Sequence, residues 1–352
     1  MLILGRVSGT VSARGVAIML GSALSNQVGA ALGAHAFGAL GPPGVVAVRQ
    51  VVAASVLLPA ARPPLRRMTW PQWWPVLLLA VVFACMNLAL YTAIDRLGLG
   101  LAVTLEFLGP LGVALAGSRS RRDLLIAAAA ATGVYVLVLP GPSSDYLGLA
   151  VGALGGACWA AYIVLNRVAG ARLPGLQAPA VATGLCALAY LPVLVLLGVG
   201  GRLTPAAVGY AVAAGVLASV VPYAADLIAL RFVPARFFGV FMSVHPVLAA
   251  LVGTVLLGQL LELHEWAGIA VVVLADAAAV ALPLLDQDSR QEVGEGLVAV
   301  QGEDGGDVLV GPDDDRAAGV AVDAPQVEDV AAAGVGAEHL LVVDEPEGAL
   351  LR

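Results

Sequence analysis

The residues of this sequence that could do chemistry are a few ionisable side chains inside long apolar segments. Glu106 and Arg49 carry opposite charges, and each lies well within such a segment. A charge held away from water costs several kcal/mol unless it is paired or faces a wet cavity, so both residues are candidates for a binding site. Facing one cavity, they could hold the ammonium and the carboxylate of a zwitterionic amino acid. A structural ion pair, or an Arg49 side chain that reaches back to the interface, is the alternative.

Two further ionisable residues, His245 and Asp276, also lie in the middle of apolar segments. With Glu106 they are the candidates for taking up a proton during a working cycle, because protonatable groups inside an apolar bundle commonly carry protons. For His245 a neutral, hydrogen-bonded packing role is the alternative. Asp226 lies about one helical turn from Arg231, so an interfacial ion pair is the favoured interpretation there.

Uncharged hydrogen-bonding side chains accompany these charges inside the apolar segments. The predicted substrate-binding set is Glu106, Arg49, Asn87, Tyr91, Tyr162 and Tyr223. Polar residues in a helical bundle also hydrogen-bond neighbouring helices, and this structural role is the alternative for each of them. Pro110, Pro222 and Pro246 fall inside the segments too, where a missing N–H kinks a helix and frees a carbonyl group that can shape a cavity.

Motifs for enzymatic chemistry are not found in the sequence. His264-Glu265 lacks the second histidine that a zinc-protease helix requires, and a P-loop needs a lysine, which this chain does not contain. Cys85, Cys158 and Cys186 lie in apolar segments without CxxC spacing, which predicts buried thiols rather than a disulfide or a zinc site. We therefore expect a protein that is not an enzyme and that needs no metal or other cofactor.

The elements that must position these side chains are apolar segments of the length that crosses a bilayer. Apolar residues make up 60% of the 352 residues and charged residues only 12%, a balance that a soluble protein of this size does not show. Ten apolar runs of roughly 18 to 25 residues each predict an all-α integral membrane protein with ten transmembrane helices. The runs cover about residues 15–38, 44–61, 73–94, 98–117, 123–140, 147–167, 178–200, 205–230, 236–258 and 265–284.

The arginines indicate how the chain is oriented. With the N-terminus in the cytoplasm, twelve arginines flank the runs on the inside and only Arg96 and Arg202 lie outside. Because cytoplasmic loops are enriched in basic residues, both termini are predicted to be cytoplasmic in a multi-pass protein of an inner or plasma membrane. The connections are short, so there is no room for a soluble catalytic domain between the helices.

An internal repeat divides the predicted spans into two halves. A shift of 136 residues aligns residues 91–117 with residues 227–253 at five identities, among them Pro110 with Pro246. The shift carries the fourth run onto the ninth, so the chain is predicted to hold two five-helix repeats, residues 1–145 and 146–285. A half with an odd number of spans ends on the opposite side of the membrane, so the second copy must be inverted. Inverted repeats that meet at a midplane cavity are the construction of many secondary transporters.

The C-terminal residues 286–352 have a different composition. They hold three arginines against seventeen acidic residues, whereas the preceding residues hold fifteen arginines against eight acidic residues. Such an acidic segment, rich in Gly and Ala and nearly free of aromatic residues, predicts a disordered C-terminal tail. A regulatory or partner-binding tail is the alternative to a solvated appendage.

Six short segments occur in a fixed order between about residues 16 and 284. They are 41–45 (GPPGV) with Arg49, 86–88 (MNL) with Tyr91, 104–111 (TLEFLGPL), 156–163 (GACWAAYI), 221–223 (VPY) and 238–246, which begins FG and ends in proline. In these segments the chain resembles the EamA-type branch of the drug/metabolite transporter superfamily. The resemblance implies proton-driven export of small neutral amino acids, similar to threonine and homoserine, without a nucleotide or metal cofactor. The chain departs from this family at His245 and Gln259, where exporters typically carry glutamate.

The leading hypothesis is therefore a secondary transporter that exports such amino acids by alternating access. The same fold with another cargo, such as a drug, a nucleotide precursor or a vitamin, is the second hypothesis, and a membrane-embedded enzyme or assembly factor is the third. The expected partners are membrane lipid, a small-molecule substrate and protons as the coupling ion, with no nucleic acid. A homodimer and a monomer both stay open.

Overall fold

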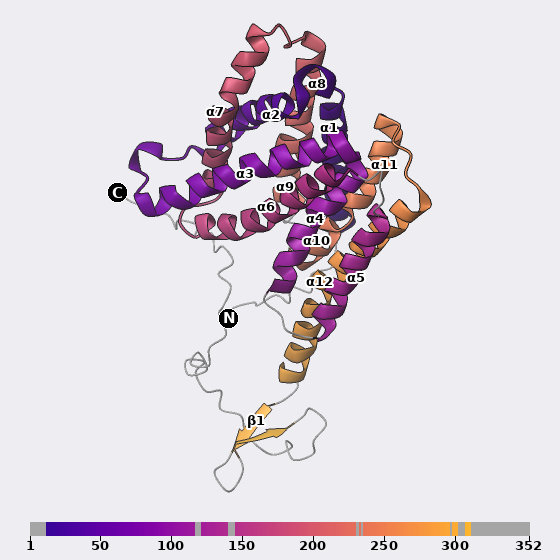
Figure 1. Ribbon diagram of the computed structural model, residues 1–352. Coiled ribbons are helices and arrows are strands. Elements are labelled where there is room, and N and C mark those ends of the chain that lie inside the picture. Colours follow the sequence, from indigo (N-terminus) through magenta and orange to yellow (C-terminus); the bar gives the residue numbers. More distant parts are fainter. Residues whose placement is uncertain are drawn as a thin grey trace, which may run out of the picture. The chain divides into compact units, whose positions relative to one another are not determined.

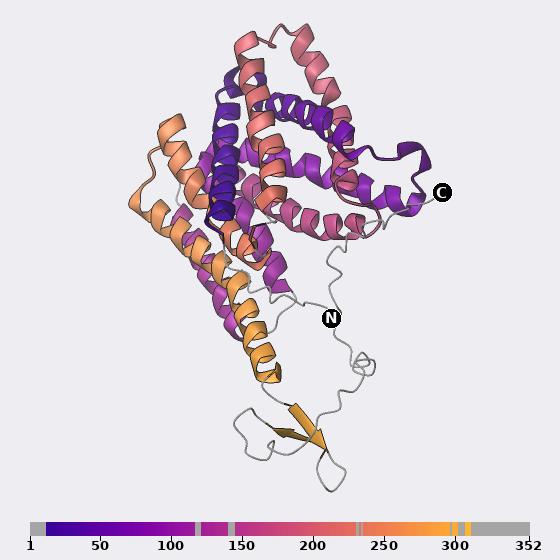
Figure 2. The same cartoon turned by 180° about the vertical axis from the view of Figure 1, so that it is seen from behind.

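The computed structural model describes residues 12–116, 121–139, 145–229, 232–233, 235–295, 298–301 and 307–310. The chain divides into two compact units, Met1–Asp288 and Ser289–Arg352. The first unit is a bundle of helices, shown in Figure 1 and from behind in Figure 2. The helices of the described chain are α1 (Ala13–Ala34), α2 (Phe37–Ala61), α3 (Trp70–Leu97), α4 (Leu99–Ala116), α5 (Arg121–Val138), α6 (Tyr146–Gly170), α7 (Gln177–Val199), α8 (Pro205–Gly215), the π-helix η2 (Val216–Val220), α9 (Val221–Ala229), α10 (Ala235–Met242), α11 (His245–Leu257) and α12 (Leu263–Glu295), with a short 3-10 helix, η1 (Leu65–Arg67), before α3.

Nine stretches of helix among the described residues are long and apolar enough to cross a membrane. Two of them combine several helices, because α8, η2 and α9 form the stretch Pro205–Asp226, and α10 and α11 form the stretch Phe237–Leu257. Helix α5 occupies the fifth predicted run, but its first turn carries Arg121, Arg122 and Asp123, and it is not among these nine. The prediction of a helical, multi-pass membrane protein is therefore confirmed for nine of the ten runs.

The second span begins earlier than the sequence predicts. Residues 39–43 are expected in a loop between the first two runs, but helix α2 already includes them. Gly41 has a φ of 66°, a left-handed conformation that glycine adopts at little cost, and the helix bends there. Pro42 and Pro43 follow the bend, where the first turn of a new helical segment does not need their missing N–H groups. The Gly-Pro-Pro segment is therefore a kink within α2.

Only part of the C-terminal segment that is predicted to be a disordered tail lies among the described residues. Helix α12 continues to Glu295, and two short strands, β1 (Val298–Gln301) and β2 (Asp307–Val310), pair in antiparallel fashion. Both strands are rich in β-branched and aliphatic side chains, which favour pairing of extended segments. The rest of the predicted tail lies outside the described residues.

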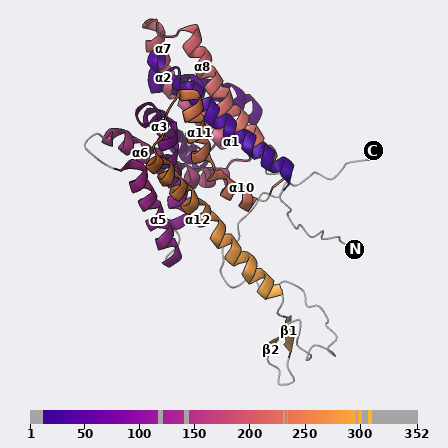
Figure 3. The same cartoon turned by 90° about the vertical axis from the view of Figure 1, so that its right-hand side faces the viewer.

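The helices of the bundle pack in a recurring pattern. Helix α6 packs against α3 and α4, and helix α1 packs against α9 and α11. Helix α2 lies along α7, and α4 lies along α11. Helix α5 runs beside α12 (Figure 3). Ile126 and Ala130 of α5 share an apolar cluster with Ala275 and Ala279 of α12. The packing therefore brings helices from the first half of the chain against helices from the second half.

Two glycines bring the backbones of α4 and α6 into contact. A Cβ atom on Gly109 would fall on the carbonyl oxygen of Gly156, and a Cβ atom on Gly156 would lie 2.8 Å from the carbonyl oxygen of Leu105. Close crossings of this kind are common between membrane helices, where small residues allow the backbones to approach. The crossing lies about one turn from Glu106 along α4, so it sets the position of this residue against α6.

Two apolar clusters fill one end of the bundle, which we call the closed end. They combine residues toward the ends of α1, α3 and α7 and residues of α11 with residues toward the starts of α2, α4 and α8. Leu40, Tyr190 and Leu197 belong to one cluster, and Ile94 and Leu99 belong to the other. Because these side chains pack tightly, the space for polar groups lies toward the opposite end.

Candidate functional site

A polar cavity lies inside the bundle and has two adjoining compartments, which together we call the central cavity. The wide compartment has a volume of about 490 Å³ and the deep compartment a volume of about 240 Å³. The residues that line both compartments are Arg49, Phe83, Tyr162, Ala218, Pro222 and Asp226. A cavity of this size, with charged groups on its walls, can hold a small polar solute together with water.

The residues predicted to bind substrate converge on this cavity. They line it from five helices: Arg49 from α2, Asn87 and Tyr91 from α3, Glu106 from α4, Tyr162 from α6 and Tyr223 from α9. His245, at the start of α11, lines the deep compartment as well. Asp276 does not join this set, because α12 carries it into a different cavity. Six helices from both halves of the chain thus contribute to one polar wall.

Arg49 is held in the wall that the two compartments share. Its Nε donates a hydrogen bond to the Ser219 hydroxyl at 2.9 Å, and its Nη1 donates to the side-chain oxygen of Asn87 at 2.8 Å. Its Nη2 donates to the carbonyl oxygen of Ala218 at 2.9 Å, and the guanidinium carbon lies 5.3 Å from the centre of the Tyr91 ring. A guanidinium has five N–H donors, so two of them remain for a ligand.

The acceptor on Ala218 is available because Pro222 follows it by four residues. In a regular α-helix the amide of residue 222 would donate to this carbonyl, but proline has no N–H. The chain also makes a π-helical turn here, Val216–Val220, and such turns are frequent at functional sites. A buried carbonyl group needs a hydrogen-bond partner, and Arg49 supplies it from α2. Two helices are thereby tied together at the cavity wall.

Glu106 lies in the deep compartment with Arg49 but does not touch it. The side chain is buried, with 7% of the residue exposed. Both residues belong to the described part of the chain, and no ion pair within 4.0 Å joins them. A Cβ atom on Gly155 of α6 would lie 3.9 Å from Cγ of Glu106, so the side chain is packed along this glycine. Opposite charges held apart in a cavity of low dielectric constant are complementary to the two ends of a zwitterion.

His245 is fixed in orientation by its neighbours. Its Nδ1 accepts a hydrogen bond from Nε2 of Gln27 at 3.2 Å, so the proton of the neutral ring is on the other nitrogen. That nitrogen, Nε2, has no hydrogen-bond partner among the described residues. The ring stacks on Phe107 with centroids 5.7 Å apart, and Phe107 contacts Trp159 edge-on at 4.6 Å. His245 therefore combines the packing role considered for it with a place in the wall of the deep compartment, and its Nε2 is buried there.

Asp226 is a cavity residue that the sequence interpretation assigned to the membrane interface. It lines both compartments and accepts a hydrogen bond from the Ser22 hydroxyl at 2.6 Å. Its expected partner Arg231 lies outside the described residues. The signal that could have revealed Asp226 is its spacing, because Tyr223 and Pro222 precede it by three and four residues and share its helix face.

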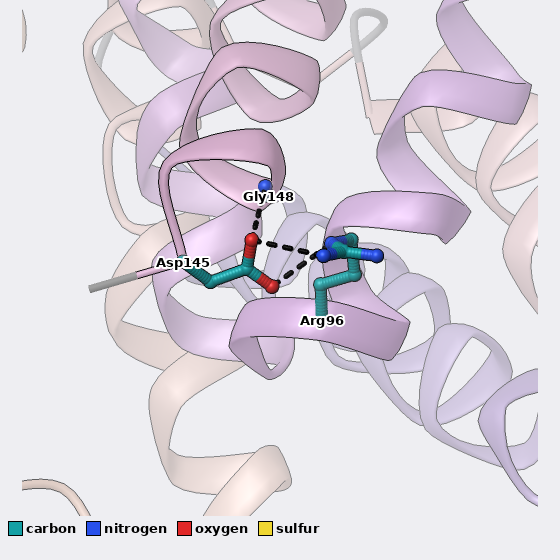
Figure 4. A network of polar contacts seen from close by, with 3 residues as sticks. All are labelled: Arg96, Asp145 and Gly148. Atoms are coloured by element: carbon teal, nitrogen blue, oxygen red, sulfur yellow. Dashed lines mark hydrogen bonds and ion pairs between the residues drawn. The ribbon is translucent and has the colours of Figure 1, made fainter. Parts of the chain in front are cut away.

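Polar contacts also link the helices at the closed end. Arg96, near the end of α3, lies 2.9 Å from one carboxylate oxygen of Asp145 and donates to the other at 3.0 Å (Figure 4). Asp145 caps α6 by accepting from the N–H of Gly148 at 2.9 Å. The Gly148 hydrogen bond, and after it Arg96, lower the pKa of Asp145 below its ordinary value. Gln259 makes a second link, since its side-chain oxygen accepts from the N–H of Leu99 at the start of α4.

Asp145→Asn is expected to lower thermal stability at neutral pH and to make no difference in acid. Because the folded-state pKa is depressed, the stabilisation is fully present above the ordinary aspartate pKa of about 3.9 and is lost as the pH falls through the lower folded value. The melting temperatures of variant and wild type in detergent should differ at neutral pH and converge in strong acid. Adding Arg96→Gln to the variant should then change little, because both substitutions remove the same contact. A difference that does not depend on pH would contradict this assignment.

The apolar helices surround a cavity whose walls carry an arginine and two carboxylates. This arrangement is typical of one class of proteins, the helical membrane transporters of small polar solutes. Among the residues that the structure describes, no group of three or more His, Cys, Asp or Glu side chains could hold a metal ion.

Comparison with known proteins identifies the family within this class. The sequence pattern of the EamA-like transporter family matches residues 146–279. The threonine/homoserine exporter RhtA of Escherichia coli is 33% identical over 263 residues, which cover 74% of this chain and 89% of that protein. RhtA of Salmonella typhimurium is 33% identical over 249 residues, 70% of this chain and 84% of that protein. The chain belongs to the EamA-like transporter family and is a transporter of small metabolites.

Two more distant similarities agree with this assignment. The uncharacterized transporter YwfM of Bacillus subtilis is 26% identical over 211 residues, 57% of this chain and 71% of that protein. A solved crystal structure with 19% sequence identity superposes with a TM-score of 0.50 and covers 78% of this chain and 99% of that chain. The second similarity shows a shared fold.

Proposed function

We propose that this transporter exports small neutral amino acids, of the threonine and homoserine kind, from the cytoplasm in exchange for protons. The observation that carries the proposal is the presence of Arg49 and Glu106 in the same compartment without an ion pair between them. A zwitterionic amino acid needs one partner of each charge. Relatives that are 33% identical and named threonine/homoserine exporters support this cargo.

The cavity offers a partner for each group of such a substrate. The two free N–H groups of Arg49 can bind the carboxylate in a bidentate manner. The ammonium group then lies toward Glu106, with Asp226 as the second carboxylate in the same cavity. Tyr162 and Tyr223 provide hydroxyl groups in the wide compartment for a polar side chain. The enclosed volume favours a small amino acid over a bulky one.

The helix packing supports two inverted five-helix repeats, with residues 1–145 and 146–285 as the halves. If the halves are exchanged, α6 takes the place of α1, and the span formed by α8, η2 and α9 takes the place of α3. The packing of α6 on α3 and α4 then becomes the packing of α1 on α9 and α11, and both pairs of contacts occur. The contacts of α2 with α7 and of α4 with α11 map onto themselves. In this arrangement α5 is the tenth membrane helix, as the counterpart of α12.

The position of the wide compartment supports a state that is open to the cytoplasm. Its lining comes from the C-terminal halves of α2, α6 and the span formed by α8, η2 and α9, and from the N-terminal halves of α3 and α7, whereas the closed end holds the opposite helix ends. The arginines near these cavity-side ends include Arg62, Arg66, Arg67, Arg167 and Arg172. Because basic loops are cytoplasmic, the cavity would receive its substrate from the cytoplasm of a cell whose inner or plasma membrane holds the protein with both termini inside. Alternating access then requires the closed end to open.

Three residues are the proposed binding sites for the coupling proton: Glu106, His245 and Asp276. Glu106 and His245 line the central cavity, where a proton competes directly with the substrate. Asp276 lies outside this cavity, where a proton and a substrate can be bound at the same time. The three positions therefore imply different orders of binding.

Glu106→Gln tests the proposed function, because it removes the charge and keeps the size of the side chain. In cells that lack their own amino-acid exporters, we expect the wild-type chain to give resistance to threonine and homoserine and to speed their efflux. The variant should lose about tenfold or more of this efflux, since a hydrogen bond to a charged group contributes roughly 1.5–3 kcal/mol. Efflux is measured with labelled amino acids and corrected for the amount of protein in the membrane.

The matched control is Glu262→Gln, which makes the same chemical change where the glutamate side chain is 78% exposed. This variant should export at the wild-type rate. If a well-inserted wild-type chain moves no amino acid, the proposed cargo is wrong, and a drug, a nucleotide precursor or a vitamin becomes the cargo to test on the same fold.

A further inference from the structure

A second cavity of about 240 Å³ lies beside the central cavity and contains one carboxylate. It is lined by residues of α4, α6, α10 and α12, with Asp276 and Ser243 as its polar members. Phe107, Trp159 and Met242 line both this cavity and the deep compartment, so these three side chains form a shared wall. The second cavity is therefore next to the substrate site but separated from it by apolar side chains.

Asp276 has no partner to neutralise it in this cavity. The residue is 5% exposed, and its Oδ2 has no hydrogen-bond partner among the described residues. It is the one ionisable group among the residues that line the second cavity. Glu106 on α4 and His245 at the start of α11 line the central cavity and not the second one. From α5, the side packed against α12 presents Ile126 and Ala130, which are apolar.

A lone carboxylate in apolar surroundings must gain a proton or a cation to avoid a large desolvation cost. Hard cations such as Ca²⁺ or Mg²⁺ take six or more oxygen ligands, whereas this cavity supplies the carboxylate and the hydroxyl of Ser243. The proton needs one oxygen atom. The composition of the second cavity therefore favours the proton as its ligand.

The second cavity and the substrate site also share a break in the chain. Helix α10 ends at Met242 and α11 begins at His245. The N–H groups of the two residues between them, Ser243 and Val244, donate hydrogen bonds to carbonyl groups of α10 three residues earlier. Pro246 has no N–H to donate to the carbonyl of Met242, so the backbone at the break is incompletely paired. Ser243 lines the second cavity, His245 lines the deep compartment, and Met242 lines both. Discontinuous helices of this kind carry the ion and substrate sites of many secondary transporters.

We propose that Asp276 binds the coupling proton in the second cavity, at a site distinct from the substrate cavity, and that the break between α10 and α11 connects the two. This inference rests on the proposed function and names the proton site within it. The carboxylate takes up one proton from water on one side of the membrane and releases it to water on the other. Protonation removes the negative charge of Asp276 from the cavity that Ser243 also lines. The break that contains Ser243 then shifts His245 and Met242, which line the substrate cavity.

The test uses the full chain, purified and reconstituted in liposomes, with Asp276→Asn. Exchange of labelled threonine for unlabelled threonine at equal pH needs no proton movement, so the variant should keep it within about twofold of wild type, since the substrate contacts are intact. Accumulation of threonine driven by a pH difference should be lost. The wild type should accumulate about tenfold for each pH unit at one proton per substrate. Glu262→Gln is the control for loss of a carboxylate and should retain both activities.

Each outcome separates the proton site from the proposed function. Accumulation that persists in Asp276→Asn overturns the proton site and leaves amino-acid export intact, whereas a wild-type chain without threonine exchange overturns the proposed function itself. If Asp276→Asn melts at the wild-type temperature but loses both exchange and accumulation, Asp276 is needed for substrate movement itself. That result overturns the proposal that the proton site is distinct from the substrate cavity. If Asp276→Asn does not fold, Asp276→Glu replaces it. This variant should keep exchange and shift the pH midpoint of driven accumulation, and an unchanged midpoint overturns the proposal.

Discussion

Replacing Arg49 with alanine is expected to reduce transport about a hundredfold or more while the protein still reaches the membrane. The guanidinium makes three hydrogen bonds in the cavity wall and retains two N–H groups for the substrate. A hydrogen bond to a charged group contributes roughly 1.5–3 kcal/mol, so loss of a bidentate contact alone accounts for this factor. Alanine also leaves the carbonyl of Ala218 and the side chain of Asn87 without their donor. Efflux of labelled threonine per inserted molecule measures the effect.

Two further variants show whether the shape of the guanidinium matters as well as its charge. Arg49→Lys keeps the charge but cannot reproduce three directed hydrogen bonds and a bidentate ligand contact, so we expect it to recover only a small part of the activity. Arg202→Gln removes an exposed arginine from the loop after α7 and should leave transport unchanged. Wild-type efflux by Arg49→Ala would show that the substrate carboxylate binds elsewhere.

Gly109→Ala should destabilise the bundle itself, because it places a methyl group at the crossing of α4 and α6. The added Cβ atom would fall on the carbonyl oxygen of Gly156, which is backbone and cannot turn aside as a side chain could. The helices must separate, and overpacking of this kind costs about 1–3 kcal/mol or more. Separation also displaces Glu106, about one turn away, so transport should fall together with the melting temperature of the purified protein.

The same helix offers a matched control for this prediction. A Cβ atom on Gly112 would meet nothing within 4 Å, so Gly112→Ala adds the same methyl group without a clash. Alanine is the better helix former by about 1 kcal/mol, and this control should be as stable as wild type or slightly more stable. Equal melting temperatures for the two variants would mean that the backbones at the crossing are farther apart than the structure has them.

The sequence by itself indicated nine membrane spans and several of the polar residues that line the central cavity. An apolar run must be long enough to cross the bilayer, and this requirement can be read along the chain without knowing which helices touch. The cost of a polar group in such a run is equally local, which is why Arg49, Glu106 and His245 stood out before the fold was known. Helix α5 is the weakest case, because three charges in its first turn lower its apolarity.

Only the tertiary structure decided which cavity each polar residue faces. Asp226 and Asp276 are both aspartates in apolar runs, yet one lines the central cavity and the other lies in the second cavity. The depth of a residue follows from its place in the run, but its direction depends on the rotation of the helix. That rotation is set by contacts between distant segments, such as the crossing at Gly109 and Gly156.

The prolines show the same division. The sequence predicts that Pro222 frees a carbonyl group, because proline lacks an N–H wherever it occurs. The partner of that carbonyl is Arg49, which is 169 residues from Ala218 along the chain. No local pattern connects two positions so far apart, since only the packed bundle places α2 beside the π-helical turn. The sequence thus determines the desolvation free energy of each polar group in an apolar run, and the packing of the helices determines which partner compensates for it.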